Sequence, residues 1–115
     1  MAKILVADDH INTLAIAEQM LMGPEHEVIT TTQGDQVQSL VAEMSPDLLI
    51  IDIFMPGTDG IENIRVIRKI HPELPIIAIS TYEDYLVVAK KLGATDAVGK
   101  PLLGSDLLDR VSELI

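Results

Sequence analysis

Short apolar runs alternate along the chain with longer segments in which apolar residues recur every three or four positions. The runs have the length of strands, and the longer segments have the periodicity of amphipathic helices. The predicted strands are Lys3–Ala7, Glu27–Thr31, Asp47–Ile51, Pro75–Ile79 and Asp96–Val98. The predicted helices are Ile11–Met22, Gln33–Met44, Gly60–Ile70, Glu83–Leu92 and Ser105–Ile115. Five such units predict an α/β fold in which helices cover both faces of a doubly wound parallel sheet with right-handed crossovers.

Residues that commonly begin or end helices flank these segments. Helix ends are marked by Gly23-Pro24, Ser45-Pro46, His71-Pro72 and Gly93. Asp59 and Ser105 stand at helix starts, where we expect their side chains to accept hydrogen bonds from backbone N–H groups of the first turn.

Two predicted helices carry more apolar residues than one core-facing stripe requires. In the first helix, we expect the core-facing residues to be Ile16, Ala17, Met20 and Leu21, with Ile11, Leu14 and Glu18 on another face. In the helix at residues 83–92, we expect the core-facing residues to be Tyr85, Val88, Ala89 and Leu92, with Leu86, Val87 and Lys90 outside. The alternative is that the remaining apolar residues have no role, because single apolar side chains are common on protein surfaces.

The composition fits one globular domain with an aliphatic core. The chain has 115 residues, of which 48% are hydrophobic but only 3% are aromatic. A domain of this size buries roughly two-thirds of its unfolded surface. Aliphatic strands suit a parallel sheet that is buried on both faces.

Charge and residue content exclude several classes of protein. The net charge of −10 repels phosphate backbones, so we expect no direct binding to nucleic acid. The chain has no cysteine, which excludes disulfides, zinc–thiolate sites and cysteine nucleophiles. Its first apolar run is too short for a signal peptide, and no run approaches the about 18 apolar residues of a membrane helix. We therefore expect a cytoplasmic protein that makes no membrane contact.

Polar side chains follow four of the predicted strands. Asp8 and Asp9 follow the first strand, Asp52 the third, Ser80 the fourth and Lys100 the fifth. The carboxyl ends of parallel strands meet at one edge of the sheet, where ligands bind in open α/β folds. Three carboxylates there repel one another, so a hard cation is the simplest way to keep them ionised. With the hydroxyl and the ammonium, the group can bind a divalent metal and a phosphoryl group together.

At these positions the sequence resembles the receiver domains of two-component response regulators. The resemblance covers essentially the whole chain and rests on Asp8-Asp9, on Asp52 followed by Met55-Pro56 and Gly60, on Ser80, and on Lys100-Pro101. It implies a flavodoxin-like (βα)5 sandwich with strand order 2-1-3-4-5, an order shared with other flavodoxin-like folds. We expect residues 1–115 to form this one domain, with no output domain present.

The resemblance implies a phosphoacceptor switch that is not an enzyme beyond weak self-catalysed phosphotransfer and autodephosphorylation. Asp52 would accept a phosphoryl group from a sensor histidine kinase or a histidine phosphotransfer protein. Lys100 would pair with Asp52 and then with the phosphoryl oxygens, and Ser80 would donate a hydrogen bond to them.

The same resemblance implies an Mg²⁺ site. Asp9 would ligate the ion directly, and Asp8 would do so directly or through water. Asp52 and the backbone carbonyl of Phe54 would supply further ligands. The histidines lack metal-ligand spacing, although His10 adjoins the acidic pair and could have a supporting or docking role.

Three residues depart from the family pattern. Ala97 stands where the family usually has an aromatic residue that reports phosphorylation, so signalling is expected to rely on backbone motion in residues 80–84. Phe54 and Thr81 are bulky for positions that overlook the site, which predicts slow hydrolysis of the acyl phosphate.

Other functional classes fit less well. A haloacid-dehalogenase-type phosphatase needs an acid two residues after its nucleophile, and Phe54 stands there. A flavodoxin-like cofactor binder needs a phosphate loop where Asp8-Asp9 stand. A degenerate receiver that acts only as an interaction module remains the alternative, because of Ala97.

The sequence leaves the wider assembly open. The resemblance makes Ile11, Leu14 and Glu18 the expected kinase-docking face. Output through a fused or a separate domain, and homodimerisation through the last two helices, both remain open.

Overall fold

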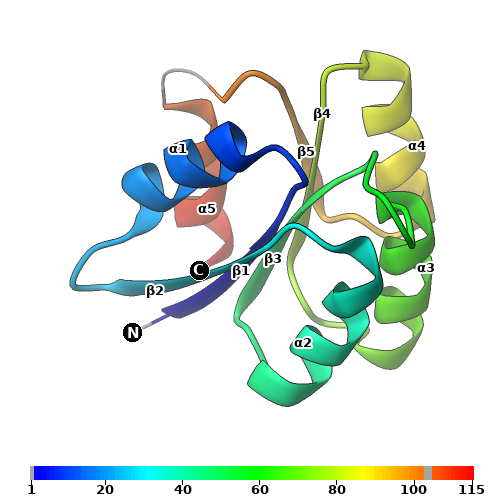
Figure 1. Ribbon diagram of the computed structural model, residues 1–115, viewed down its shortest axis with the longest axis horizontal. Helices are drawn as coiled ribbons and strands as arrows, with labels where there is room; N and C mark the ends of the chain where they lie inside the picture. The colour runs from blue at the N-terminus through cyan, green and yellow to red at the C-terminus, as the bar shows by residue number, and fades with distance from the viewer. Residues whose placement is uncertain (1, 103–104) are drawn as a thin grey trace.

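The computed structural model describes residues 2–102 and 105–115, which form a five-stranded parallel sheet between two layers of helices (Figure 1). The strands are β1 (Ala2–Ala7), β2 (His26–Thr31), β3 (Leu48–Asp52), β4 (Ile76–Ser80) and β5 (Asp96–Gly99). The helices are α1 (Ile11–Leu21), α2 (Val37–Met44), α3 (Gly60–Ile70), α4 (Glu83–Leu92) and α5 (Asp106–Leu114). The strand order is β2-β1-β3-β4-β5, which confirms the predicted fold. None of the described helices is long and apolar enough to cross a membrane.

The sequence predicted most helix and strand boundaries correctly. Every strand lies within two residues of its prediction. The Asp59 carboxylate caps α3 as expected, accepting a hydrogen bond of 2.9 Å from the Glu62 N–H. Ser105 does stand at the N-cap position of α5, but its side chain makes no cap hydrogen bond, because its hydroxyl donates to the Asp109 carboxylate instead. The predicted helix from Gln33 also begins differently, with a short 3-10 turn, η1 (Gly34–Gln36), before α2.

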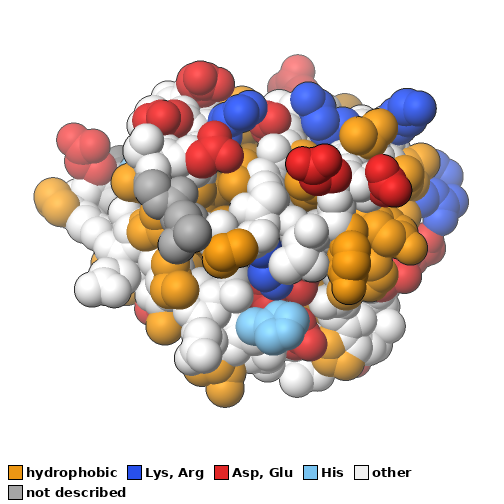
Figure 2. All heavy atoms as spheres, turned by 90° about the horizontal axis from the view of Figure 1, so that it is seen from above, with side chains coloured by type: hydrophobic (Ala, Val, Ile, Leu, Met, Phe, Trp, Pro, Cys, Tyr) orange, Lys and Arg blue, Asp and Glu red, His pale blue; other side chains and the backbone are white. Residues whose placement is uncertain are grey.

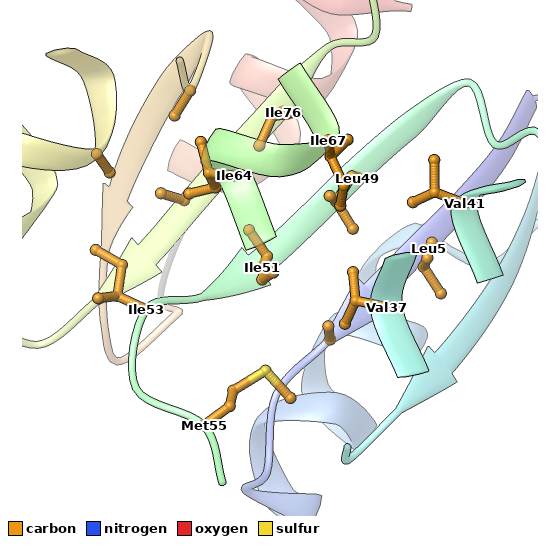
Figure 3. Packing of buried hydrophobic residues seen from close by; sticks show 14 residues of the cluster. Leu5, Val37, Val41, Leu49, Ile51, Ile53, Met55, Ile64, Ile67 and Ile76 are labelled. Atoms are coloured by element: carbon orange, nitrogen blue, oxygen red, sulfur yellow. The ribbon is translucent and has the colours of Figure 1, made fainter. Parts of the chain in front are cut away.

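The core consists of aliphatic side chains on both faces of the sheet. Side chains alternate between faces along a strand, so Leu5 and Leu49 pack under α2 and α3 (Figure 3), whereas Ile4 and Ile50 pack under α1 and α5. Strands β3 and β4 are buried along their whole length. The polar residues at their ends are therefore held on a rigid scaffold.

Two helix orientations differ from the predictions. In α1, Leu14 is only 6% exposed and joins Ala17 and Leu21 in the core, while Ile16 is exposed. The buried positions 14, 17 and 21 form a regular helical stripe. The helix has enough apolar residues to bury either this stripe or the predicted one. Leu14 is therefore wrong as a member of an exposed docking face, whereas Ile11 is 73% exposed.

Helix α4 is also rotated relative to its prediction. It contacts the core through Ala89 and Leu86, and it leaves Tyr85, Val88 and Leu92 exposed. The small Ala89 side chain is completely buried against the sheet, where a larger side chain would hold the helix further away. The most apolar stripe of α4 consequently faces outward.

Gly60 is required by the packing of α3 against the end of β3. A Cβ atom at this position would lie 2.2 Å from the Asp52 carbonyl oxygen, whereas one at Gly23 would meet nothing within 4 Å. We expect Gly60→Ala to lower the free energy of unfolding by about 2 kcal/mol, the usual cost of overpacking, and Gly23→Ala to have little effect. Urea unfolding of both variants checks this, and equal stabilities would contradict it.

Candidate functional site

The predicted site residues do meet at the carboxyl edge of the sheet. Asp52 and Ser80 are the last residues of β3 and β4, and Asp8 and Lys100 directly follow β1 and β5. Parallel pairing in register brings these ends side by side. Figure 2 looks down on this edge and shows a histidine, acidic and basic side chains together beside a patch of hydrophobic side chains.

Asp8 and Asp52 form a buried acidic pair that shares one ammonium group. Asp8 is completely buried and Asp52 is 2% exposed. Lys100 Nζ donates a hydrogen bond of 2.9 Å to Asp8 Oδ2 and lies 3.4 Å from Asp52 Oδ2. That second contact is an ion pair without hydrogen-bond geometry, so Asp52 Oδ2 is buried without a hydrogen-bond donor. As placed among the described residues, Lys100 satisfies Asp8 and leaves Asp52 Oδ2 without a hydrogen bond.

The surroundings of Asp52 disfavour its charged form. Burial and the nearby Asp8 carboxylate raise the pKa of Asp52 to about 6, and Lys100 opposes that rise. A nucleophilic carboxylate must be ionised. A cation bound beside Asp52 would favour the ionised form by the same electrostatics.

Asp9 lies at the rim of the site, where its side chain is 34% exposed. One ligand atom from each of Asp8, Asp9, His10 and Asp52 lies within 4.8 Å of the others. The expected carboxylates therefore gather as predicted, and His10 joins them. In the sequence, the only indication of a role for His10 is its position next to Asp8 and Asp9.

Ser80 is held in place by the turn that follows it. Its side chain is buried, and Oγ accepts a hydrogen bond of 3.0 Å from the Tyr82 N–H. The Lys100 N–H donates to the Ser80 carbonyl oxygen at 2.8 Å, which ties the end of β5 to the end of β4. The hydroxyl hydrogen of Ser80 can still be donated to a group bound beside Asp52.

The chain's three aromatic side chains form one cluster beside the site. The ring centroid of Phe54 lies 4.8 Å from that of Tyr85 and 5.7 Å from that of Tyr82, and both contacts are edge-to-face. The rings line a cavity of about 1130 Å³, which His10 and Ile11 also line. Sequence reasoning noted that Phe54 is bulky, but it placed Tyr85 in the core and missed the cluster.

A buried amide supports the loop that carries Phe54. Asn63 Nδ2 donates to the carbonyl oxygens of Gly34 and Thr58, at 2.9 and 3.3 Å. These bonds join η1 to the segment between β3 and α3. Sequence reasoning missed Asn63, although a polar residue in the core-facing stripe of a helix is an available signal.

Comparisons with known proteins agree with this geometry. A family model described as the response regulator receiver domain matches residues 4–112. The solved chemotaxis protein CheY4 of Vibrio cholerae is 26% identical with a TM-score of 0.89, and the match covers 100% of this chain and 99% of that one. The Francisella response regulator 1452 receiver domain is 26% identical with a TM-score of 0.90, covering 99% and 96% of the two chains.

Two structures of NtrX from Brucella abortus extend the comparison. Its receiver domain is 32% identical with a TM-score of 0.84, and the match covers 96% of this chain and 94% of that one. In a longer NtrX chain, the match is 33% identical with a TM-score of 0.86 and covers 97% of this chain but 26% of that one. The family match spans nearly the whole sequence, and the fold is the same. This chain belongs to the response regulator receiver domain family, the phosphoacceptor modules of two-component signalling.

Proposed function

We propose that this domain accepts a phosphoryl group on Asp52 from the phosphohistidine of a sensor histidine kinase or histidine phosphotransfer protein, with Mg²⁺ bound beside it. One observation carries the proposal: within the part of the chain that the structure describes, Asp52 Oδ2 is buried without a hydrogen-bond donor, and Asp52 belongs to a cluster of potential metal ligands. An orphaned buried carboxylate oxygen costs free energy unless a bound group satisfies it. Nucleophilic attack on phosphorus is also the simplest chemical role for such an oxygen on an aspartate at the end of a strand.

The donor set fits Mg²⁺. The ion prefers oxygen ligands, keeps several waters and is usually held by a few carboxylates together with substrate phosphate. Asp8, Asp9 and Asp52 would hold it, and the backbone carbonyl of Phe54 stays a predicted further ligand. When bound, Mg²⁺ supplies positive charge that offsets the charge on the phosphoryl oxygens.

The protein's own groups would carry the transfer. A carboxylate oxygen of Asp52 forms a bond to phosphorus as the bond from phosphorus to the donor's imidazole nitrogen breaks. The nitrogen keeps the electron pair. Lys100, whose Nζ lies 3.4 Å from Asp52 Oδ2, would pair with the incoming phosphoryl oxygens, and Ser80 would donate its hydroxyl hydrogen to one of them. The Ser80–Tyr82 hydrogen bond supports the idea that residues 80–84 shift with Ser80, in a domain with Ala97 on β5.

The alternatives have less support. A phosphatase of the haloacid-dehalogenase type needs an acid where Phe54 contacts two tyrosines. A degenerate receiver has no need to keep Asp8 and Asp52 buried together at a cost in stability. Because Leu14 belongs to the core, the kinase-docking proposal rests on the exposed Ile11 and its surroundings.

The first test is phosphorylation by a small donor. After incubation with acetyl phosphate and Mg²⁺, the protein is expected to gain the mass of one phosphoryl group. Asp52→Asn and a metal-free sample should gain none, because the first lacks the nucleophile and the second the cation. Intact mass spectrometry reads this out, and phosphorylation of Asp52→Asn would contradict the assignment.

Removing the shared ammonium should make stability depend on the cation. Lys100→Ala leaves two buried carboxylates without their counter-charge, so in EDTA we expect a loss of about 3 kcal/mol in the free energy of unfolding. Saturating Mg²⁺ should reverse much of this loss, because it supplies positive charge at the same place. Urea unfolding with and without Mg²⁺ measures both values, with the exposed Lys91→Ala as control. An equal loss in both conditions would contradict the proposed site.

The aromatic cluster is expected to limit hydrolysis of the acyl phosphate. Phe54→Asn removes the ring that contacts Tyr82 and Tyr85, which should admit water and shorten the phosphoprotein's half-life. Phe54→Leu keeps an apolar side chain and should change the half-life less. Decay of the added mass after removal of donor gives the rates. An unchanged rate in Phe54→Asn would show that the ring does not shield the site.

A further inference from the structure

His10 places a ring nitrogen among the acidic ligands. Its Nδ1 lies 3.1 Å from Asp8 Oδ1 and 3.3 Å from Asp9 Oδ1. The backbone N–H of His10 also donates to Asp8 Oδ1 at 2.8 Å. That bond fixes the turn after β1 so that the imidazole lies over the carboxylates. The ring itself remains accessible, with a side chain 65% exposed.

In this structure His10 Nδ1 is at hydrogen-bond distance from Asp8 Oδ1 and from Lys100 Nζ, at 3.1 and 3.5 Å. The separations within the acidic cluster are also close to those between ligands of one octahedral ion. When ligands lie about 2.1 Å from such an ion, neighbouring ligand atoms lie about 3.0 Å apart and opposite ones about 4.2 Å apart. The distances from His10 Nδ1 to Asp8 and Asp9 are close to the first value. The 4.8 Å limit on the whole set, Asp52 included, is only slightly above the second value. A small inward movement would bring all four side chains onto one cation.

The unsatisfied oxygen of Asp52 points independently to a ligand here. Among the described residues, the buried Oδ2 has no hydrogen-bond partner, although its carboxylate belongs to the cluster. The nearest ammonium, Lys100 Nζ, is already hydrogen-bonded to Asp8. The cluster thus combines a buried acceptor in need of a cation with an accessible imidazole.

We propose that His10 is a nitrogen ligand of this site and makes it bind imidazole-accepting divalent metals, such as Mn²⁺, Co²⁺, Ni²⁺ and Zn²⁺, more tightly than Mg²⁺. Imidazole suits these metals, whereas Mg²⁺ strongly prefers oxygen. The inference rests on the proposed cation site and adds a fourth side chain to it. It assigns metal selectivity to a residue that the phosphoryl transfer does not use.

The other histidines provide matched controls. His26 Nδ1 lies 3.2 Å from the Leu21 carbonyl oxygen, and His71 follows the end of α3. Among the described residues, neither belongs to a group of potential metal ligands. Removing His71 should therefore leave metal binding at the site unchanged.

The test measures affinity and coordination separately. Calorimetric titrations with Ni²⁺ and with Mg²⁺ compare the unsubstituted chain with His10→Ala and His71→Ala. We expect His10→Ala to weaken Ni²⁺ binding by about tenfold or more, because the loss of residues that support a metal site commonly lowers metal affinity by about that factor. The affinity for Mg²⁺ should change little. Electron spin-echo modulation of bound Mn²⁺ should show a directly coordinated nitrogen in the unsubstituted chain and in His71→Ala, but not in His10→Ala.

The outcomes separate this inference from the proposed function. If Mg²⁺ binds, and Asp52→Asn weakens that binding, while no nitrogen signal appears, His10 is not a ligand and the cation site stands. If His10→Ala lowers the affinities for Ni²⁺ and Mg²⁺ by the same factor, the selectivity proposal is also wrong. If neither metal binds with any dependence on Asp52, the proposed cation site fails, and this inference fails with it.

Discussion

The organising constraint of this domain is a pair of buried carboxylates with one ammonium between them. Asp8 and Asp52 are both removed from water, and in the structure Lys100 gives a hydrogen bond to Asp8 while it lies 3.4 Å from Asp52 Oδ2 without hydrogen-bond geometry. A pKa of about 6 for Asp52, against an ordinary 3.8, means that ionising this carboxyl in the folded chain costs about 3 kcal/mol more than ionising it in water. Few natural domains exceed a total stability of about 15 kcal/mol. The site is therefore a substantial local instability.

The rest of the fold holds this pair in place. Strands β3 and β4 are buried along their full length between two aliphatic clusters, so the residues at their ends cannot move apart without disrupting the core. Gly60 lets α3 approach the last residue of β3 closely, and Asn63 holds the following loop against η1. Packing thus supplies the free energy that offsets the electrostatic cost. A more mobile edge would let the carboxylates separate and reach water.

The sequence predicted features that depend on period and order along the chain. Buried strands appear in the sequence as aliphatic runs. The polar residue that ends each run, such as Asp52 or Ser80, necessarily lies at the edge of the parallel sheet that all the carboxyl ends share. Helix rotation was harder to predict. Both α1 and α4 have apolar residues on more than one face, so tertiary contacts decided that Leu14 turns inward and Tyr85 outward. The aromatic cluster joins segments separated along the chain, and no local pattern encodes that contact.

The electrostatics that disfavour the charged form of Asp52 also favour the binding of a cation beside it. A group that brings positive charge to Asp52 is bound more tightly because the carboxylate lacks a full partner without it. A phosphoryl group attached there would pair with Lys100 and accept a hydrogen bond from Ser80. These two residues also join the ends of β4 and β5, because the Lys100 N–H donates to the Ser80 carbonyl oxygen. The Ser80 hydroxyl also accepts a hydrogen bond from the Tyr82 N–H, and Tyr82 is the residue directly before α4, so the end of β4 is connected to the start of that helix. The outward stripe of α4, with Tyr85, Val88 and Leu92, begins at that point, so exposed apolar side chains lie beside the site.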